Sequence, residues 1–260
     1  MKITWFGTAS LAVDAERGRL LIDPFFPFSG SPTRVSPEAY DGYGHILVTH
    51  GHFDHILSLP ELCRRQRRRV YCTRTPFETL RRRGVGEDAL VRIAPGEVFE
   101  IEGIRVTAYQ SRHVRYDRAI LRKTLLSPRM LRHARNLPRA VSGFLCYPEN
   151  GETLGFLIEA DGVRLFAMGS LNLDPDVEYP TDMDLLVLPY QGTSDLLTPG
   201  AQVVARLKPR AVLLDHFDDA FPPISNAVDT SDIQRRFDGV LPVRRLEPGQ
   251  SLELTAARSG

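Results

Sequence analysis

Cysteine is scarce in this chain: the three present, Cys63, Cys72 and Cys146, form neither a close pair nor a Cys-x-x-Cys motif. An odd number of widely spaced cysteines argues against a disulfide framework and fits a reducing compartment. The apolar core of a signal peptide is also lacking, because the chain opens directly on the strand-like run Lys2-Ile3-Thr4-Trp5-Phe6. The cytoplasm is therefore the expected location.

Two further absences narrow the classes of function. No apolar run approaches the roughly 18 residues that a membrane-spanning helix needs, so no transmembrane segment is expected. Excess charge is missing as well, since 33 Lys and Arg balance 32 Asp and Glu. A balanced chain gives no general indication of a nucleic-acid or membrane partner. Aromatic residues interleaved with basic ones, which suit single-stranded nucleic acid, are sparse, so nucleic acid is not expected.

Histidine, by contrast, is concentrated in one loop. Three of the seven histidines lie in the segment Thr49-His50-Gly51-His52-Phe53-Asp54-His55, directly after an apolar run at 46–48. Imidazole is the commonest protein ligand of zinc and also suits iron and nickel. Alternation along an extended segment lets the rings of His50 and His52 converge on one point, while Asp54 and His55 can face a second. The alternative interpretation is a solvated polar turn between a strand and a helix.

The order of expected elements predicts the class of fold. Expected strands lie near 2–6, 10–13, 19–22, 45–48, 91–93, 98–101, 104–109, 153–159, 163–168, 185–188, 211–214, 241–244 and 251–254. Expected helices lie near 55–68, 76–83, 199–207 and 229–236. Each half of the chain opens on short strands and continues with alternating strands and helices. We therefore expect an α/β fold, a four-layer αββα sandwich with two mixed sheets face to face, formed as one domain over residues 1–260.

The stretch 112–139 interrupts this alternation. It carries nine Arg or Lys against a single acid, Asp117. A stretch of this length is too long for a simple loop between two strands, so we expect either a lid or a surface insertion. Arg112 and Arg115 are candidates to bind a phosphate or carboxylate through bidentate contacts. The alternative is that these arginines form a solvated face.

A complete metal site needs ligands from distant parts of the chain. His113 follows the expected strand 104–109, and His216 follows the apolar run Ala211-Val212-Leu213-Leu214-Asp215. Strands of such a sandwich would deliver both side chains to the end that carries the histidine loop. Taken alone, each is as readily an ordinary structural histidine. Taken with the loop, both are expected ligands.

With these residues in view, the chain resembles the metallo-β-lactamase superfamily. The similarity is to the branch of small metal-dependent hydrolases related to ascorbate-phosphate lactonases and the phospholipase D that acts on N-acylphosphatidylethanolamines. The signature Thr-His-x-His-x-Asp-His is matched without gaps by Thr49 to His55, and the resemblance covers nearly the whole chain outside the basic stretch. Further similar segments are Leu21-Ile22-Asp23-Pro24, Gly155-Phe156-Leu157-Ile158-Glu159, Leu188-Pro189-Tyr190-Gln191-Gly192-Thr193 and Asp215-His216-Phe217. The resemblance implies one metal at His50, His52 and His113, and a second at Asp54, His55 and His216.

One position departs from the pattern of the family. After the strand ending at 168, the family usually has Gly-Asp, whose carboxylate bridges the two metals, whereas this chain has Gly169-Ser170. A neutral hydroxyl is a poor ligand for a divalent ion and brings no charge to offset two neighbouring cations. We therefore expect one tight metal and a second that binds weakly or is absent. Asp174 is an alternative source of a carboxylate, although Asp174-Pro175 is more typical of a turn.

Two other residues are candidates for supporting roles. Asp23 ends a strand where the first histidine pair is expected, so its carboxylate would orient a metal-binding imidazole by accepting its second N–H. The alternative is a capping aspartate before Pro24. Tyr190, in one of the segments shared with the family, is a candidate contact to the substrate.

Three neutral histidines and an open position are typical of a catalytic metal, because a structural one is closed by four protein ligands. Such an ion lowers the pKa of bound water from 15.7 to roughly 7, and Asp54 would orient that water or take its proton. We predict a metal-dependent hydrolase, with zinc as the favoured metal and iron, manganese or nickel as alternatives. The favoured substrate is a small anionic molecule such as a phosphodiester. The alternatives are a hydrolase of carboxylic esters, lactones or thioesters, and a non-catalytic protein that binds a metal or an anion.

Overall fold

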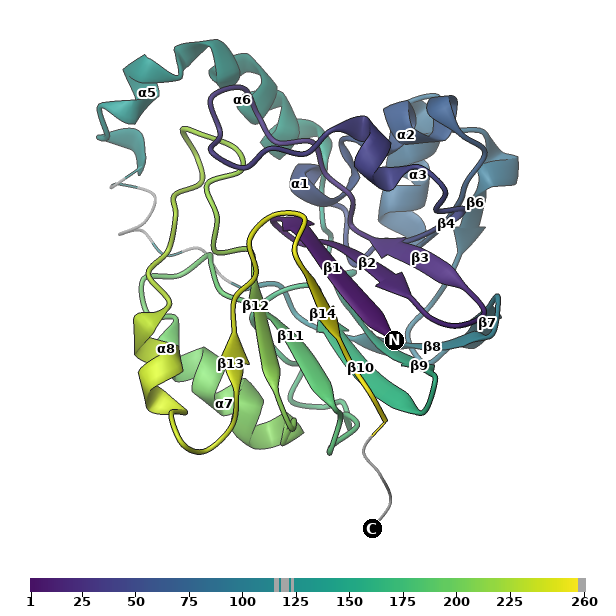
Figure 1. Cartoon of the computed structure of the whole chain (residues 1–260). Coiled ribbons are helices and arrows are strands. Elements are labelled where there is room, and N and C mark those ends of the chain that lie inside the picture. The colour runs from purple at the N-terminus through teal and green to yellow at the C-terminus, as the bar shows by residue number, and fades with distance from the viewer. Residues whose placement is uncertain (115–116, 118–121, 123, 257–260) are drawn as a thin grey trace.

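The computed structural model describes residues 1–114, 117, 122 and 124–256. Within these residues the strands form two mixed sheets of seven strands each, as expected (Figure 1). The first sheet has the order β14-β1-β2-β3-β4-β5-β6. Its strands are β1 (Lys2–Gly7), β2 (Ser10–Asp14), β3 (Arg19–Ile22), β4 (His45–Leu47), β5 (Arg69–Cys72), β6 (Leu90–Arg92) and β14 (Ser251–Glu253).

The second sheet has the order β13-β12-β11-β10-β9-β8-β7. Its strands are β7 (Val98–Ile101), β8 (Ile104–Gln110), β9 (Leu154–Ala160), β10 (Val163–Met168), β11 (Leu185–Pro189), β12 (Val212–Asp215) and β13 (Val243–Arg244). The strands β10, β11 and β12 are parallel neighbours, and β8 runs in the same direction because both β8 and β10 pair antiparallel with β9. Their carboxyl ends therefore meet at one edge of the sheet.

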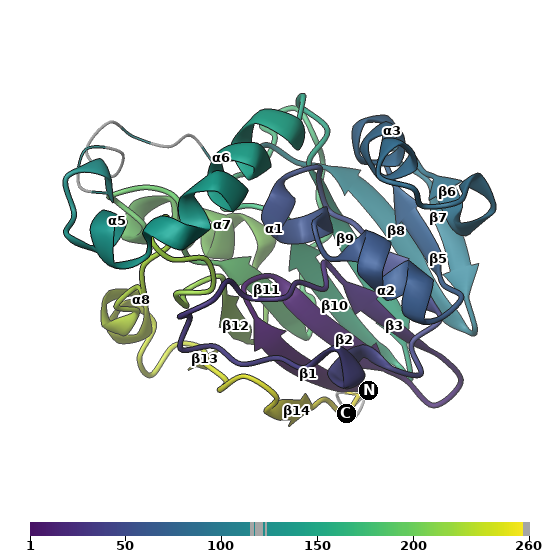
Figure 2. The same ribbon diagram turned by 90° about the horizontal axis from the view of Figure 1, so that it is seen from above.

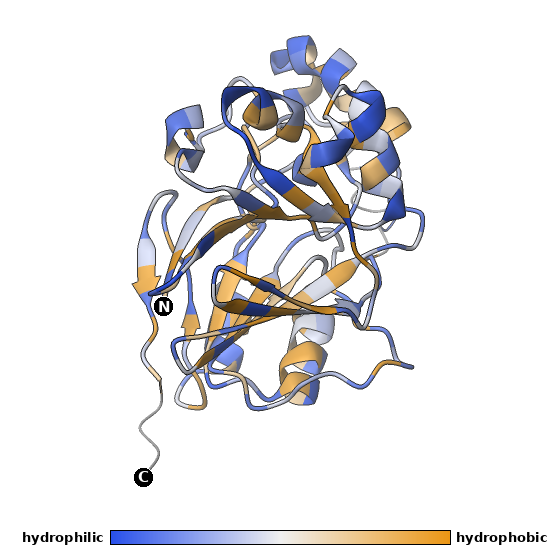
Figure 3. Cartoon of the chain, turned by 90° about the vertical axis from the view of Figure 1, so that its right-hand side faces the viewer, coloured by the Kyte–Doolittle hydropathy of each residue, from blue (hydrophilic) through white to orange (hydrophobic). Residues whose placement is uncertain are grey.

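Helices cover the outer face of each sheet, which completes the four layers (Figure 3). The α-helices are α1 (Phe53–Ile56), α2 (Leu59–Arg65), α3 (Arg74–Arg82), α5 (Arg129–Arg132), α6 (Leu137–Cys146), α7 (Leu197–Leu207) and α8 (Ser231–Arg236). Short 3-10 helices lie at Pro37–Tyr40, Glu87–Ala89 and Ala134–Asn136. None of the helices within the described residues is long and apolar enough to cross a membrane.

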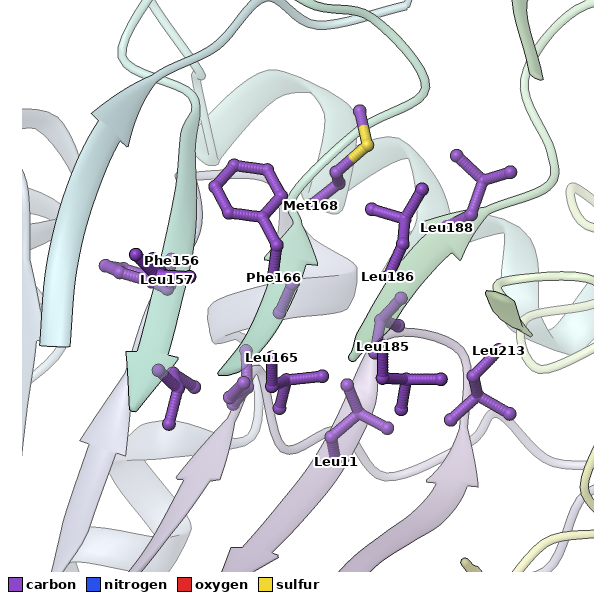
Figure 4. Packing of buried hydrophobic residues seen from close by; sticks show 14 of the residues in the cluster. Leu11, Phe156, Leu157, Leu165, Phe166, Met168, Leu185, Leu186, Leu188 and Leu213 are labelled. Carbon is purple, nitrogen blue, oxygen red and sulfur yellow. The ribbon is translucent and has the colours of Figure 1, made fainter. Parts of the chain in front are cut away.

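The main core lies between the two sheets. Successive side chains of a strand point to opposite faces, so alternate residues of β2, β10, β11 and β12 are available to the interior. In Figure 4, Leu11 of the first sheet points toward Leu185 and Leu213 of the second, and all three are fully buried. Phe166 and Leu186 project from the opposite face of the second sheet. Burial on both faces explains why these strands are almost continuously apolar.

The expected helix at 55–68 is wrong, because the structure has two short helices there. α1 ends at Ile56, α2 begins at Leu59, and the chain is already in β5 at Arg69. Proline is tolerated in the first turn of a helix but not in its interior, and Pro60 lies in the first turn of α2. The break gives α1 a direction of its own, and α1 carries two of the candidate metal ligands.

Helix α6, which begins within the basic stretch, packs beside α1 (Figure 2). The described part of this stretch contains α5, and it continues into α6, which contacts α1 (Figures 1 and 2). The contact is close, since a Cβ atom added to Gly143 of α6 would lie 2.7 Å from the ring of Phe53. A glycine at this crossing therefore lets α6 approach the helix that follows the histidine loop.

Candidate metal centre

The predicted site residues all follow strands whose carboxyl ends meet at one end of the sandwich. The parallel pair β3 and β4 supplies one side, and the parallel strands β8, β10 and β12 supply the other. Asp23 follows β3, the histidine loop follows β4, His113 follows β8, Ser170 follows β10 and His216 follows β12. The carboxyl ends of parallel strands are the usual place for a ligand in α/β folds.

The first donor group consists of His50, His52 and His113, which each offer one ligand atom, all within 4.8 Å of one another. His50 is buried, and the other two are half-buried. Nε2 of His50 lies 3.2 Å from Nδ1 of His52. Nδ1 of His113 lies 2.6 Å from the carbonyl oxygen of Val114, which only accepts, so this nitrogen carries the proton. Nε2 of His113 is then the nitrogen suited to a metal.

The second donor group consists of Asp54, His55 and His216, whose ligand atoms also lie within 4.8 Å of one another. Oδ2 of Asp54 lies 3.7 Å from Nε2 of His55 and 3.6 Å from Nε2 of His216, and the two nitrogens are 3.4 Å apart. A point equidistant from three atoms at such separations is about 2.1 Å from each, which matches zinc–nitrogen and zinc–oxygen distances. The second group therefore fits a divalent ion without rearrangement.

A buried carboxylate connects the two groups. Oδ1 of Asp23 accepts the backbone N–H of Thr49 at 2.9 Å, and Oδ2 accepts from Nδ1 of His55 at 2.7 Å and from Oγ1 of Thr49 at 2.5 Å. Oγ1 of Thr49 also lies 3.1 Å from Nδ1 of His50. Asp23 is fully buried. It thus orients His55 of the second group directly, and it reaches the first histidine pair, where it was expected, only through Thr49.

The environment keeps most of these imidazoles neutral, which is the form that binds metal. Burial and the charge of His55 lower the pKa of His50 well below its ordinary value. Burial and the neighbouring His113 lower the pKa of His52 to about 3. Burial also lowers the pKa of His113, and it lowers that of His216 well below its usual range.

His55 differs from the other donors. Burial by itself would lower its pKa, but the negative charges of Asp23 and Asp54 outweigh burial and raise the pKa of His55 above its ordinary value. A proton on this ring is consistent with its 2.7 Å contact to the Asp23 carboxylate. Protons therefore compete with a metal at His55 up to a higher pH than at the other imidazoles.

Ser170 lies at the site, where the resemblance places a bridging carboxylate. It is buried and lines a small cavity of about 30 Å³ together with members of both donor groups. Its Oγ accepts the backbone N–H of Val114 at 2.9 Å, so it fixes the backbone next to His113. Asp174 does not replace the missing carboxylate. It accepts a hydrogen bond from Nε of Arg112 at 3.0 Å and another from the backbone N–H of Asp176, as expected for a turn.

The structure corrects two predicted substrate contacts. The ring of Tyr190 is fully buried, and its hydroxyl donates to Oδ1 of Asp232 at 2.8 Å rather than facing a cavity. The guanidinium of Arg112 is held by Asp174 and Asp176, and Arg112 lines neither the small cavity nor the larger one beside it. Both side chains point away from the cavities because they form a hydrogen bond or ion pairs elsewhere. Arg115 lies outside the described residues.

Other residues at the site are not apparent from the sequence. Gln191 and Gly192 line the small cavity, directly after the misassigned Tyr190, and Phe221 lines it from a loop beyond β12. One signal for Gln191 was present in the sequence. Neighbouring side chains on an extended segment point to opposite sides, so if Tyr190 points into the core, Gln191 points toward the cavity. The same three residues also line a cavity of about 800 Å³, which Asp54 and His52 border as well. The two cavities are therefore continuous at the donor groups.

Comparisons with known proteins agree with this architecture. A family model described as a β-lactamase superfamily domain matches residues 18–217. A metal-dependent hydrolase of Pyrococcus furiosus is 25% identical over 261 residues, which cover 98% of this chain and 100% of that protein.

Two solved structures share the fold at low sequence identity. A metallo hydrolase of the archaeon Ignicoccus hospitalis has a TM-score of 0.64 at 18% identity, covering 98% of this chain and 99% of its own. Zinc-bound PqqB of Methylobacterium extorquens has a TM-score of 0.63 at 17% identity, covering 98% of this chain and 100% of its own. These likenesses extend over both sheets of the sandwich.

Proposed function

The chain belongs to the family of β-lactamase superfamily domains. We propose that it is a metal-dependent hydrolase with one tightly held divalent ion and a second donor group that binds an ion weakly or not at all. His50, His52 and His113 would hold the first ion, and Asp54, His55 and His216 the second. The observation that carries the proposal is the convergence of both groups on one small cavity that adjoins a large one. Zinc is the proposed metal because five of the six donors are imidazoles, and PqqB, which shares the fold, contains zinc.

The residues around the donors would move protons and orient the imidazoles. A bound divalent ion supplies Lewis acidity and lowers the pKa of water to roughly 7. Asp54 is buried and borders both cavities, so its carboxylate is placed to accept a proton from an attacking water and return it to the leaving group. Asp23 and Thr49 hold the rings of His50 and His55 in fixed orientations.

The class of bond depends on how many ions are held tightly. We propose hydrolysis of a carboxylic ester, lactone or thioester, because Ser170 contributes no charge between the donor groups and one ion suffices for this chemistry. A phosphodiester is the second candidate. It is favoured by the intact group of Asp54, His55 and His216, since two neighbouring ions would stabilise both oxygens of a displacement at phosphorus.

Metal content tests the site and the effect of Ser170 together. Zinc per chain is measured by elemental analysis after purification without chelator, for the wild type, Ser170→Asp and the neutral, similarly sized Ser170→Asn. We expect about one tightly held ion in the wild type, a gain toward about two in Ser170→Asp, and no gain in Ser170→Asn. Two tight ions in the wild type would contradict the role given to Ser170. Full metal content in His50→Ala would contradict the assignment of the first donor group.

A substrate panel tests the reaction itself. Zinc-loaded protein is assayed with a carboxylic ester, a thioester, a lactone and bis(p-nitrophenyl) phosphate, and the same panel is run on Asp54→Asn. We expect turnover of the acyl substrates, reduced about a hundredfold or more in Asp54→Asn, because loss of a general base typically costs that much. Absence of turnover with every substrate and metal, together with tight binding of an anion, would point instead to a non-catalytic protein.

A further inference from the structure

The small cavity at the donor groups is too small for a substrate. Its volume of about 30 Å³ has room for an ion or a water molecule. The adjoining cavity of about 800 Å³ lies in the size range of small-molecule sites. Because His52 and Asp54 border this larger cavity, any molecule that reacts at the donors must place the rest of its structure there. The walls of the larger cavity therefore indicate the class of substrate.

Apolar side chains dominate those walls. Phe53 forms edge-to-face contacts with Phe144 at 5.4 Å and with Phe221 at 5.2 Å between ring centroids. These three rings come from α1, α6 and the loop beyond β12, so they are fixed by separate elements. The other apolar residues of the wall are Leu125, Leu196, Ile224, Ala227 and Val228. Such a wall stabilises hydrocarbon or aromatic groups and offers few hydrogen bonds to a polar one.

The described residues of the walls supply no positive charge for an anionic group. None of the arginines or lysines that the structure describes lines the cavity, whereas Asp117 and Asp229 do. The carboxylate of Asp117 accepts the backbone N–H of Ser194 at 2.7 Å. The carboxylate of Asp229 accepts that of Ser231 at 2.9 Å, which lowers the pKa of Asp229 and keeps it charged. The described part of the wall therefore offers no positive partner for a phosphate or carboxylate held there.

The described part of the basic stretch and the adjoining helix α6 contribute apolar surface to this cavity. Leu125 and Phe144 are 57% and 51% exposed, and both line the cavity. Two described arginines of the stretch have partners elsewhere: Arg129 pairs with Asp219 at 2.5 Å, and the guanidinium of Arg139 lies 4.6 Å from the ring centroid of Phe28. Half-exposed apolar side chains beside a reactive centre are typical of a surface that a ligand covers.

We propose that the 800 Å³ cavity binds an apolar acyl group, so that the substrate is an uncharged ester, thioester or lactone with its carbonyl at the donor groups. This inference rests on the proposed hydrolase function. Hydrolysis adds water across the acyl bond: the carbon–oxygen or carbon–sulfur bond breaks, the water oxygen joins the acyl carbon, and its protons pass to the leaving group and the solvent. The products are a carboxylate and an alcohol or a thiol, which remain in one molecule when the substrate is a lactone.

A chain-length series tests the proposal on the zinc-loaded full chain. The substrates are p-nitrophenyl acetate, butyrate, octanoate and dodecanoate, with bis(p-nitrophenyl) phosphate as the anionic comparison. We expect kcat/KM to rise about fourfold for each added methylene until the cavity is filled. A flat dependence on chain length would overturn the acyl site and leave the hydrolase function standing. Turnover of the phosphodiester alone would also overturn the acyl site and leave the hydrolase function standing.

Variants of exposed wall residues avoid effects on folding. Phe144→Ala should lower the ratio of kcat/KM for the octanoate ester to that for the acetate ester about tenfold or more. Leu145→Ala is the matched control, since Leu145 is the next residue of α6, is 78% exposed and does not line the cavity. Ala227→Trp should shift the preferred substrate to a shorter chain by filling the cavity. Equal effects of Phe144→Ala and Leu145→Ala would overturn the proposal.

A binding measurement separates the two proposals. The uncharged fluorescent probe N-phenyl-1-naphthylamine should bind the zinc-loaded chain with increased emission, and octanol should displace it. Ala227→Trp should weaken the binding of the probe about tenfold or more, because the ring removes much of the space. Probe binding without turnover of any substrate of the panel, the phosphodiester included, would contradict the hydrolase function, and with it the substrate class. Turnover of esters without probe binding would contradict only the apolar cavity as their site.

Discussion

At the scale of single residues, Asp23 and Thr49 determine how the donors are presented. One carboxylate accepts hydrogen bonds from the backbone of Thr49, from the hydroxyl of Thr49 and from Nδ1 of His55. The hydroxyl of Thr49 in turn reaches Nδ1 of His50. When the outer nitrogens of two imidazoles are fixed in this way, their inner nitrogens are aimed at the site. A substitution at Asp23 should therefore weaken metal binding at both donor groups, and most strongly at the second.

Asp23→Asn is expected to weaken zinc binding about tenfold to a hundredfold, because a neutral amide orients His55 poorly. The control is Asp215→Asn, next to His216 and equally buried. Burial raises the pKa of Asp215 well above its ordinary value, which favours the neutral acid that the amide resembles. Zinc affinity is measured by competition with a chromogenic chelator. Equal losses in the two variants would show that general disruption, and not the hydrogen bond to His55, is responsible.

The pKa shifts predict that the two groups lose metal at different pH values. The raised pKa of His55 means that a proton competes with the metal, so affinity at the second group should fall as the pH drops through that value. The lowered pKa values of His50, His52 and His113 mean that the first group stays neutral well below pH 6.5. Calorimetric zinc titrations at pH 8 and pH 6 should show the second group weakened first. A parallel decline of both groups would contradict this assignment.

At the scale of elements, the end of β10 presses against the histidine loop. A Cβ atom on Gly169 would lie 2.6 Å from both the carbonyl oxygen of Leu154 and Cβ of Thr49. The backbone N–H of Leu154 donates to the carbonyl of Thr49 at 2.8 Å, which ties β9 of the second sheet to the loop of the first. Glycine at 169 permits this approach, since neither the carbonyl nor Thr49 can move without disturbing Asp23.

Gly169→Ala should destabilise the protein by about 1–3 kcal/mol through overpacking, and it should lower zinc affinity by displacing Thr49. Gly44→Ala is the matched control, because a Cβ atom there meets no atom within 4 Å and the backbone is not in the left-handed region. The free energy of unfolding is measured in urea, and zinc content is measured on the same samples. Undiminished stability and zinc content in Gly169→Ala would show that the loop tolerates displacement.

At the scale of the whole molecule, the metal centre joins the two sheets. The loop after β4 of the first sheet supplies His50, His52, Asp54 and His55, and the second sheet supplies His113 and His216. Each proposed ion would therefore bridge the sandwich at the end where the strands open. The backbone link from His216 to the carbonyl of Thr8, at 2.9 Å, crosses between the sheets at the same end.

Removal of metal should consequently lower the thermal stability of the entire fold. An ion present at a hundredfold excess over its Kd stabilises the folded state by about 2.7 kcal/mol, which corresponds to roughly 5–10 °C in Tm for a chain of this size. Differential scanning calorimetry with and without chelator measures the change, and His50→Ala should show a smaller one. An identical Tm in zinc and in chelator would mean that no ion bridges the sheets.

The local pattern of the chain was sufficient to predict the sandwich, the histidine loop and its partners His113 and His216. Alternating strands and helices encode the layers, because the period of the apolar residues is a property of each segment. Ligands at the carboxyl ends of strands meet once those strands are parallel. The structure brings all six predicted donors together in two compact groups.

Other features were decided only by tertiary packing. The division of one expected helix into α1 and α2, the turn of Tyr190 into the core, and the pairing of Asp23 with His55 depend on side-chain directions that spacing does not encode. The apolar cavity is formed by α1, α6 and loops from both halves of the chain. The basic stretch 112–139 favoured an anionic substrate. The fold instead places leucine and phenylalanine in that cavity and pairs Arg112 and Arg129 with aspartates elsewhere, because the partners of a side chain depend on the packing of the whole molecule.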